Sequence, residues 1–340
     1  MSNLYQCIKK TLENHLNNDF PCVKFDTGSE KLTNTFGQVK LIVDQLSDYF
    51  EQHFSNRNLV IGLDFNVNKP SIIYILPAII AILKHPTFSF QVLNTDSDEE
   101  EFNALISPSV SKNSDSVGPL FVTNLHFNDV KVKDSIYQVK TSGTTPGGQT
   151  LISVFHDSIW PNFCDFSRIF GLDHSDVIFS AAPPTFDPFY LDVLLSFLSS
   201  ACLLLTSQKV KIQSGKKLSE ILKCNHVTFC QMTPSLFRSL NTDFPPLKYL
   251  LLGGEAFPTK NEIQAVNWNC QTKLFNLYGL TEMSVWQSMV EVSDLYDEIP
   301  IYTKDNLLSE VRFSVQVLTI FNSPCTILRF MFRLGNWSKK

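Results

Sequence analysis

The sequence predicts an α/β protein with doubly wound, mostly parallel sheets and helices on both faces, and three observations lead to this prediction. Short apolar runs rich in β-branched residues alternate with helical segments along most of the 340 residues. Several of these runs end in glycine or proline, as in LLLGGE at 250–255, where a strand would give way to a loop. The composition is that of a globular protein, with 44% hydrophobic and 18% charged residues, and the length suggests two or three packed subdomains.

The first third of the chain predicts a helix followed by a strand–helix–strand unit. Apolar residues recur at helical spacing in the first segment, and Asn34 or Thr35 can cap its start. The expected elements are a helix at 35–53, a strand at 58–65, an apolar helix at 71–83 and a strand at 87–93. This order indicates a parallel βαβ unit. The polar stretch 94–118 is expected to be a loop or an insertion.

The alternation continues beyond a strand at 135–140, which leads into a loop rich in glycine and threonine. Helices are expected at 157–170, 190–200, 217–223 and 234–240. Strands are expected at 177–189 (broken at Pro183-Pro184), 201–206, 227–230, 247–255 and 272–282. The tail differs, because no acidic residue follows Glu310; VRFSVQVLTIF at 311–321 alternates like a strand, and the residues after it fit no element.

Charge, cysteine spacing and apolar runs exclude several classes of protein. The net charge is −5 with no long basic stripe, which argues against nucleic acid as a partner. The 8 cysteines form no CxxC pair, which argues against a zinc site. The N-terminus lacks a signal-peptide core, so we expect a cytoplasmic protein with free thiols. The apolar runs at 71–83 and 190–206 are short of the ~20 clean residues of a membrane span, so no span is expected.

The loop KTSGTTPGGQT at 140–150 is the first candidate site. Small hydroxyl residues and glycines allow backbone N–H groups to approach a phosphate closely. Gly143, Gly148 and Thr150 have the spacing of a P-loop, but Gln149 stands where the P-loop lysine would be. A P-loop enzyme would also need a strand ending in aspartate to order its magnesium, and the GGE at 253–255 matches this poorly. A turn without a ligand is the alternative interpretation.

Four motifs in order change this interpretation: TSGTT at 141–145, TFDP at 185–188, GGE at 253–255 and NLYGLTE at 276–282. The chain resembles the adenylate-forming superfamily, which contains acyl-CoA synthetases and the adenylation domains of peptide synthetases, because that family carries these motifs in this order. The flanking QMTPSLFRSL, LLLGGEAFP and FNLYGLTEMSVW are similar to the β-alanine-activating members of the acyl-CoA synthetase family. The resemblance covers roughly residues 30 to 300.

The resemblance implies a fold, a reaction and a set of ligands. The fold would be the large N-terminal domain of an adenylate-forming enzyme. The reaction would use ATP and Mg²⁺, with the substrate carboxylate attacking the α-phosphate to give an acyl-adenylate and pyrophosphate. A thiol, either CoA or carrier-protein phosphopantetheine, would then take the acyl group. The protein's part in such a reaction is mainly positioning and charge stabilisation.

The resemblance also assigns roles to individual residues of this sequence. The loop over the β- and γ-phosphates would be Thr141, Ser142, Gly143, Thr144 and Thr145. The nucleotide would be held by Gly253, Gly254, Glu255, Asn276, Tyr278 and Gly279, with Tyr278 packing against adenine. Thr281 would lie near the α-phosphate as a catalytic residue. Glu282 would be both catalytic and the magnesium ligand, because its carboxylate offers a hard oxygen.

Phe186 and Asp187 are the predicted substrate-binding residues. In family members that activate amino acids, the aspartate after the aromatic residue of this motif pairs with the substrate ammonium, and a buried carboxylate needs such a partner. Asp187 therefore favours an amino acid such as β-alanine over a fatty acid. The alternative is that Asp187 caps the following helix, with Pro188 as the first helical residue.

The chain departs from the family pattern in two places. Pro146, Gly148 and Gln149 replace the family's glycine, proline and lysine, which weakens the loop's hold on pyrophosphate. No TGD motif follows Glu282, so we expect an AMP-binding domain at 1–310, a divergent tail at 311–340, and no C-terminal domain with its catalytic lysine. The rival hypothesis is a truncated, non-catalytic nucleotide-binding protein.

Overall fold

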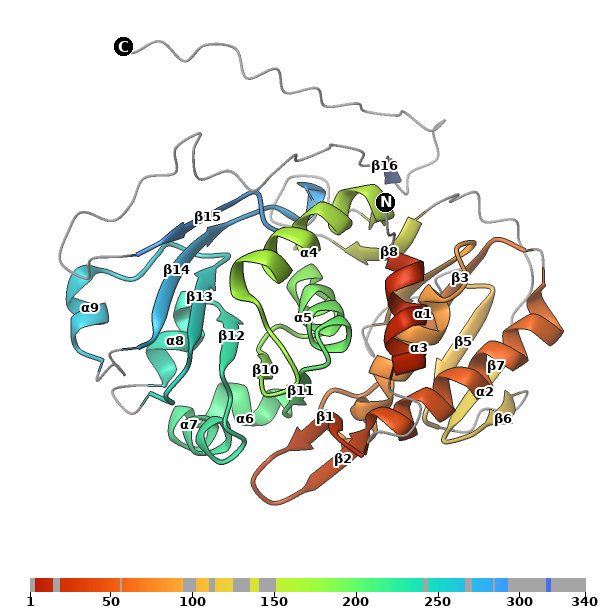
Figure 1. Ribbon diagram of the computed structural model, residues 1–340, viewed down its shortest axis with the longest axis horizontal. Coiled ribbons are helices and arrows are strands. Elements are labelled where there is room, and N and C mark those ends of the chain that lie inside the picture. Colours follow the sequence, from red (N-terminus) through yellow and green to blue (C-terminus); the bar gives the residue numbers. More distant parts are fainter. Residues whose placement is uncertain are drawn as a thin grey trace, which may run out of the picture.

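The computed structural model describes residues 4–14, 19–55, 57–93, 102–109, 114–124, 135–140, 151–240, 244–266, 271–283, 285–292 and 316–318 (Figure 1). Two sheets of eight strands each form within these residues, and helices lie between and outside them. The predicted phosphate loop at 141–150 and nearly all of the tail after 292 lie outside the described residues.

The first sheet carries the strand ends that matter for function. Its strands, in spatial order, are β15 (Ser288–Glu291), β14 (Lys273–Tyr278), β13 (Tyr249–Gly253), β12 (Phe229–Met232), β10 (Val177–Ser180), β11 (Cys202–Leu205), β1 (Pro21–Asp26) and β2 (Lys31–Thr35). The six strands from β14 to β1 are parallel, and only the edge strands β15 and β2 run antiparallel to their neighbours. The carboxyl ends of β10, β12, β13 and β14 therefore meet at one edge of the sheet.

The second sheet contains the predicted βαβ unit. Its order is β16 (Gln316–Leu318), β9 (Leu151–Phe155), β8 (Ser135–Lys140), β4 (Phe88–Val92), β3 (Leu59–Leu63), β5 (Ala104–Ser107), β7 (Leu120–Asn124) and β6 (Ser114–Val117). Strands β3 and β4 are parallel neighbours, which confirms the prediction. The expectation of a plain loop at 94–118 is wrong in part, because β5 and β6 fall within it. Both strands have four residues, and Asp115 and Ser116 of β6 are exposed, so neither gives a clear apolar pattern.

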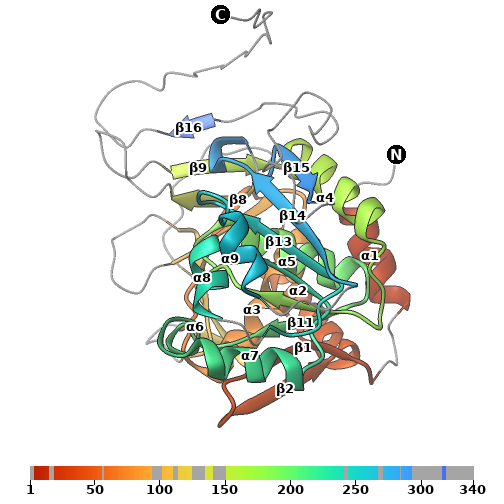
Figure 2. The ribbon, with the colours of Figure 1, turned by 90° about the vertical axis from the view of Figure 1, so that its left-hand side faces the viewer.

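Helices cover the sheets on both sides. They are α1 (Leu4–Asn14), α2 (Phe36–Phe54), η1 (Pro70–Tyr74), α3 (Ile75–Leu83), α4 (His156–Phe170), α5 (Asp187–Leu198), α6 (Gln208–Gln213), α7 (Gly215–Cys224), α8 (Pro234–Ser239), α9 (Lys260–Gln264) and η2 (Thr281–Met283). Helices α4 and α5 lie between the two sheets, and α6 to α9 cover the outer face of the first sheet (Figures 1 and 2). The sequence did not predict the short helices α6 and α9.

The apolar run at 71–83 forms η1 and α3, and every residue of α3 is buried. It is a core helix, as expected. No helix in the described part of the chain is both long and apolar enough to cross a bilayer.

An aromatic cluster fixes α4 against the first sheet. The Phe170 ring at the end of α4 lies 5.1 Å from Phe229 of β12, 5.0 Å from Tyr249 of β13 and 5.3 Å from Phe275 of β14, measured between ring centroids. Edge-on packing of this kind adds stability beyond the buried area. The cluster contacts three adjacent parallel strands, and so helps to fix their positions relative to one another.

The start of α2 offers a stability test. Thr35 and Gln38 form a capping box, in which the Thr35 hydroxyl accepts from Gln38 N at 3.3 Å and Gln38 Oε1 accepts from Thr35 N at 2.9 Å. We expect Thr35→Ala to lower the free energy of unfolding by about 1 kcal/mol. Chemical denaturation measures this, with Thr35→Ser as the control that keeps the hydroxyl. Equal loss in both variants would contradict the capping role.

Candidate active site

A cavity of about 660 Å³ opens at the carboxyl ends of β10, β12, β13 and β14, and we call it the strand-end cavity. Its walls come from 181–188 after β10, 231–233 at the end of β12, 253–255 at the end of β13, 279–281 after β14, 285–286 before β15, and helices α6 and α8. Ligands of open α/β sheets bind at this edge, outside the carboxyl ends of the strands. The position therefore makes the cavity the first candidate for an active site.

Seven of the ten predicted site residues that the structure describes come together here. Those that line the strand-end cavity are Phe186, Asp187, Gly253, Gly254, Glu255, Gly279 and Thr281. Asn276, Tyr278 and Glu282 are not among the lining residues. Asn276 is buried within β14, whereas Tyr278 and Glu282 are exposed on either side of Thr281. Thr141, Ser142, Gly143, Thr144 and Thr145 lie outside the described residues.

Asp187 is the buried carboxylate of the cavity. Helix α5 begins at Asp187 itself, with Phe186 at the N-cap position and Pro188 as the second helical residue. The alternative in which Pro188 opens the helix therefore does not hold. Asp187 Oδ2 accepts from Val285 N at 3.3 Å, across 98 residues of sequence. Burial, with a smaller contribution from the nearby charge of Glu282, raises the pKa of Asp187 to about 6, although the hydrogen bond from Val285 N–H lowers it.

Gln231 connects the elements that form the floor of the cavity. Its Oε1 accepts from the Trp286 indole N–H at 2.8 Å, and its Nε2 donates to Asp192 Oδ1 at 2.6 Å and to the Pro188 carbonyl at 3.0 Å. Asn162 of α4 donates to the Trp286 carbonyl. One amide thus joins β12, α5 and the segment before β15. Buried polar groups with this many partners fix a unique geometry.

Sequence reasoning missed Gln231, Asp192 and Trp286 as members of the site. The sequence indicates these residues only weakly. Gln231 and Trp286 lie in the segments QMTPS and MSVW, which flank the motifs, and Asp192 interrupts the apolar run at 190–206. Asp192 is 0% exposed, and burial raises its pKa to about 8. An isolated acidic residue in an apolar run indicates a buried partner, which here is the Gln231 amide.

Two of the predicted glycines are explained by Trp286. A Cβ at Gly279 would lie 1.9 Å from the Val285 carbonyl oxygen and 2.9 Å from Trp286 Cε3. A Cβ at Gly253 would lie 2.7 Å from Trp286 Cη2. Gly254 has open space around it but a φ of +83°, which favours glycine for its backbone conformation. Gly253 therefore leaves room for the indole ring, and Gly279 leaves room chiefly for the Val285 carbonyl and also for the edge of that ring.

Val285 marks a strained point in the wall of the cavity. It is a β-branched residue with φ of +69°, where such residues are rare. Its N–H is the donor to Asp187, and its carbonyl faces Gly279. Strained backbone persists where surrounding contacts hold it, and it concentrates at functional sites. The Trp286 ring next to it supplies such contacts.

Glu255 connects two walls of the cavity. Its Oε2 accepts from Ser235 N at 2.9 Å and from Ser235 Oγ at 2.5 Å. The carboxylate thus sits at the start of α8, where backbone N–H groups lack helical partners. This contact fixes the loop after β13 relative to α8.

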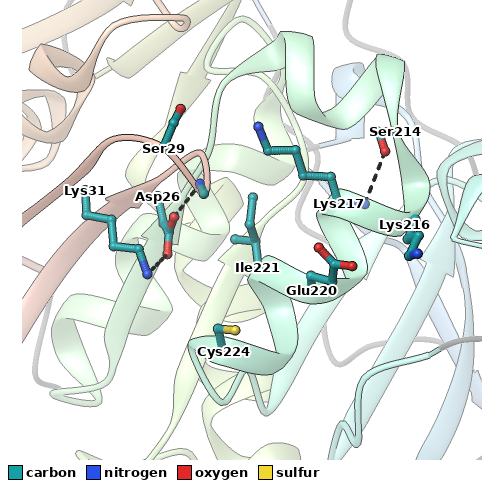
Figure 3. Close-up of a pocket in the computed structure, with 10 residues that line it drawn as sticks. Asp26, Ser29, Lys31, Ser214, Lys216, Lys217, Glu220, Ile221 and Cys224 are labelled. Atoms are coloured by element: carbon teal, nitrogen blue, oxygen red, sulfur yellow. Dashed lines mark hydrogen bonds and ion pairs between the residues drawn. The ribbon is translucent and has the colours of Figure 1, made fainter.

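A second cavity, of about 630 Å³, lies between the turn after β1 and helix α7 (Figure 3). Asp26 in its wall is already paired: Lys31 Nζ lies 3.2 Å from Oδ2, Asn225 Nδ2 donates to Oδ2 at 2.8 Å, and Gly28 N donates to Oδ1 at 2.6 Å. None of the motif residues lines this cavity. The strand-end cavity is therefore the candidate active site.

The described residues contain no group of three or more His, Cys, Asp or Glu side chains placed to hold a metal ion. Glu282 contributes a single exposed carboxylate beside the cavity. Magnesium in nucleotide sites commonly takes one or two carboxylates and completes its shell with phosphate oxygens and water. The carboxylate of Glu282 fits that role in its chemistry.

Comparison with known proteins identifies the class. The family model described as AMP-binding enzyme matches residues 69–308, and the chain belongs to that family. Among curated relatives, the beta-alanine-activating enzyme of Mus musculus is 36% identical over 171 residues, covering 46% of this chain and 15% of that protein. The enzyme of the same name from Homo sapiens is 33% identical over 202 residues, covering 54% of this chain and 18% of that protein. The chain thus spans less than a fifth of the length of these relatives.

Solved structures show the same fold. A four-domain nonribosomal peptide synthetase bound to AMP and glycine superposes with a TM-score of 0.64 at 16% identity, over 87% of this chain and 22% of that one. The Vibrio cholerae adenylation domain AlmE, in complex with glycyl-adenosine-5′-phosphate, gives a TM-score of 0.64 at 16% identity, over 85% of this chain and 61% of that one. The predicted fold, that of the N-terminal domain of adenylate-forming enzymes, is confirmed.

The steric role of Gly279 can be tested directly. We expect Gly279→Ala to lower the free energy of unfolding by about 1–3 kcal/mol, because the new methyl group overlaps the Val285 carbonyl. The displaced Trp286 should also shift the tryptophan emission to longer wavelength. Gly254→Ala is the control for the emission only: its φ of +83° also makes alanine costly for stability, but its methyl group meets nothing within 4 Å and should leave the emission unchanged. An unshifted emission in Gly279→Ala would contradict the packing role.

The cost of burying Asp187 gives a second test. Its pKa rises from 3.8 to about 6 on folding, so the folded state retains a proton that the unfolded state loses, and stability falls as the pH rises from 4 to 6. This difference in pKa between the unfolded and folded states lowers the free energy of unfolding by about 3 kcal/mol at neutral pH. We expect Asp187→Asn to be more stable than wild type at pH 7.5, by up to that amount, and to lose the advantage near pH 4.

Urea unfolding at pH 4.5 and pH 7.5 measures this difference. Asp157→Asn is the matched control, because that side chain is 83% exposed and lies outside the cavity. If Asp187→Asn is no more stable than wild type at pH 7.5, other groups of the folded chain must stabilise the buried Asp187 carboxylate.

Proposed function

We propose that this chain uses ATP to activate the carboxyl group of a short amino acid, such as β-alanine, as an acyl-adenylate for transfer to a thiol. The observation that carries the proposal is Asp187. It is 5% exposed, lines the strand-end cavity, and forms no ion pair with a lysine, arginine or histidine among the residues described. A buried carboxylate of this kind is stabilised by a cation, and a substrate ammonium supplies one.

The surrounding residues suit the first step of this chemistry. The substrate carboxylate attacks the α-phosphate, the phosphorus–oxygen bond to pyrophosphate breaks, and the enzyme contributes positioning and charge stabilisation. In this proposal the Thr281 hydroxyl donates a hydrogen bond to the α-phosphate. Glu282, the next residue, is the ligand for Mg²⁺. The ion would neutralise charge on the phosphates. Tyr278 offers a half-exposed ring, 49% exposed, for the adenine.

The names of the curated relatives and the ligands in the structural neighbours support the proposal. Curated relatives from four animals are named beta-alanine-activating enzyme. The structural neighbours include a peptide synthetase solved with AMP and glycine and another in an AMPPNP-bound form. A further neighbour contains adenylation and PCP domains. For this chain, CoA or carrier-protein phosphopantetheine is the proposed thiol.

A non-catalytic nucleotide-binding protein is the second candidate function. Gln149 favours it, because the phosphate loop has an uncharged residue where the family has lysine. The loss of one charge-assisted contact corresponds to about 1.5–3 kcal/mol, which weakens catalysis without abolishing nucleotide binding.

ATP–pyrophosphate exchange separates the two candidates. We expect exchange with β-alanine and much less with propionate, which has the same chain length without the ammonium. Asp187→Asn should lower kcat/KM for β-alanine by about a hundredfold or more, since removing one partner of a buried ion pair costs about 3–5 kcal/mol. Exchange with β-alanine should also decline below pH 6, where Asp187 takes up a proton.

Asp157→Asn is the control and should exchange as wild type does. ATP binding without exchange would establish the non-catalytic candidate. Equal exchange with β-alanine and propionate would contradict the role of Asp187 while leaving acid activation in place.

A further inference from the structure

Lys211 is the cation of the strand-end cavity. It lies on α6, and it is the one lysine, arginine or histidine among the described residues that line the cavity. The residue is only 8% exposed. Buried lysines are rare, and a buried ammonium needs hydrogen-bond acceptors and a compensating charge.

Two of the three N–H groups of Lys211 have acceptors. Nζ donates to the Ser180 carbonyl at 2.9 Å and to the Ala181 carbonyl at 3.0 Å. The Phe179 ring, with its centroid 5.5 Å from Nζ, adds a cation–π contact. No third hydrogen-bond acceptor for Nζ is found among the residues that the structure describes. One N–H of a buried ammonium at the cavity wall therefore remains available to a ligand.

The charge of Lys211 is only partly compensated within the fold. Asp192 is the nearby acidic group, but its Oδ1 accepts from Gln231, and no hydrogen-bond partner for its Oδ2 is found in the described part of the chain. Burial raises the pKa of Asp192 to about 8 and lowers the pKa of Lys211 to about 8. The charge of each group favours the charged form of the other, and no hydrogen bond or ion pair joins Lys211 to Asp192 among the described residues. The cavity thus presents a cation without a hydrogen-bonded anion.

Asp187 and Lys211 are two ionisable side chains of opposite charge that line the same cavity. Asp187 stands at the start of α5 and is influenced by Glu282, whereas Lys211 comes from α6 and is influenced by Asp192 and Cys230. Met232 of β12 and Leu236 of α8 contribute apolar side chains to the lining. A ligand that carries an ammonium and a second anionic group can satisfy both ionisable side chains.

We propose that Lys211 is a specificity residue that binds a carboxylate of the substrate other than the carboxylate being activated. The inference rests on the proposed function and narrows its substrate class to amino acids with two carboxylates, such as aspartate or glutamate. β-Alanine satisfies Asp187 and leaves the third N–H of Lys211 without an acceptor. A dicarboxylic amino acid satisfies Asp187 and Lys211 and still presents a carboxylate to ATP.

The test measures ATP–pyrophosphate exchange with aspartate, glutamate and β-alanine. We expect wild type to use one of the dicarboxylic amino acids with a kcat/KM at least about tenfold above that for β-alanine. In Lys211→Met this ratio should fall by about 10–100-fold, the range for a lost hydrogen bond to a charged group. Lys209→Met is the control, because Lys209 is exposed on the same helix and does not line the cavity, and its ratio should equal that of wild type.

The outcomes are distinguishable from failure of the proposed function. No exchange with any acid would refute the proposed function, and the inference with it. Exchange with β-alanine that exceeds exchange with both dicarboxylic acids would overturn the inference alone. An equal fall for all three acids in Lys211→Met would assign Lys211 a purely structural role. If Lys211→Met does not fold, calorimetric binding of aspartate and β-alanine to wild type decides between the same alternatives.

Discussion

The close approach of Trp286 to the ends of β13 and β14 sets the shape of the strand-end cavity. The indole ring takes the space of a side chain at position 253, and the Val285 carbonyl with the edge of the same ring takes that space at position 279, so both positions need glycine. From there its N–H reaches Gln231, whose amide also holds Asp192 and the Pro188 carbonyl. The strained backbone of Val285, directly before the ring, delivers its N–H to Asp187. The elements that form the cavity thus depend on one packing contact.

Three buried ionisable groups lie in the cavity wall or directly behind it. Asp187, Asp192 and Lys211 are each at most 8% exposed, and burial shifts the pKa of each toward its neutral form. Such groups cost folding free energy, and they recur where a protein must bind or transform a charged ligand. The large aromatic and aliphatic core that joins both sheets offsets that cost, because burial of apolar surface is the main favourable contribution to folding.

Helix α5, which begins at the cavity, packs against a strand of the second sheet. Tyr137 of β8, in the second sheet, lies 4.3 Å from Tyr190 of α5 between ring centroids. Strand β8 ends at Lys140, immediately before the phosphate-loop motif, and α5 begins at Asp187. The strand that leads into the predicted phosphate loop is therefore packed against the helix that carries the predicted substrate ligand. The Tyr190 hydroxyl adds a hydrogen bond of 2.6 Å to the Pro184 carbonyl, in the same TFDP-containing segment.

The fold class, the parallel βαβ unit and the long amphipathic helices could be predicted from the sequence alone. The four motifs also indicated the site residues, and seven of these line one cavity in the structure. These features depend on local periodicity and on short motifs, which a sequence displays directly. The tertiary structure alone decided that Gln231, Asp192, Lys211 and Trp286 belong to the same site. Their contacts join residues 31 to 55 positions apart, and the Asp187–Val285 contact spans 98. No local pattern encodes such pairs, because they form only when parallel strands bring their carboxyl ends to a common edge.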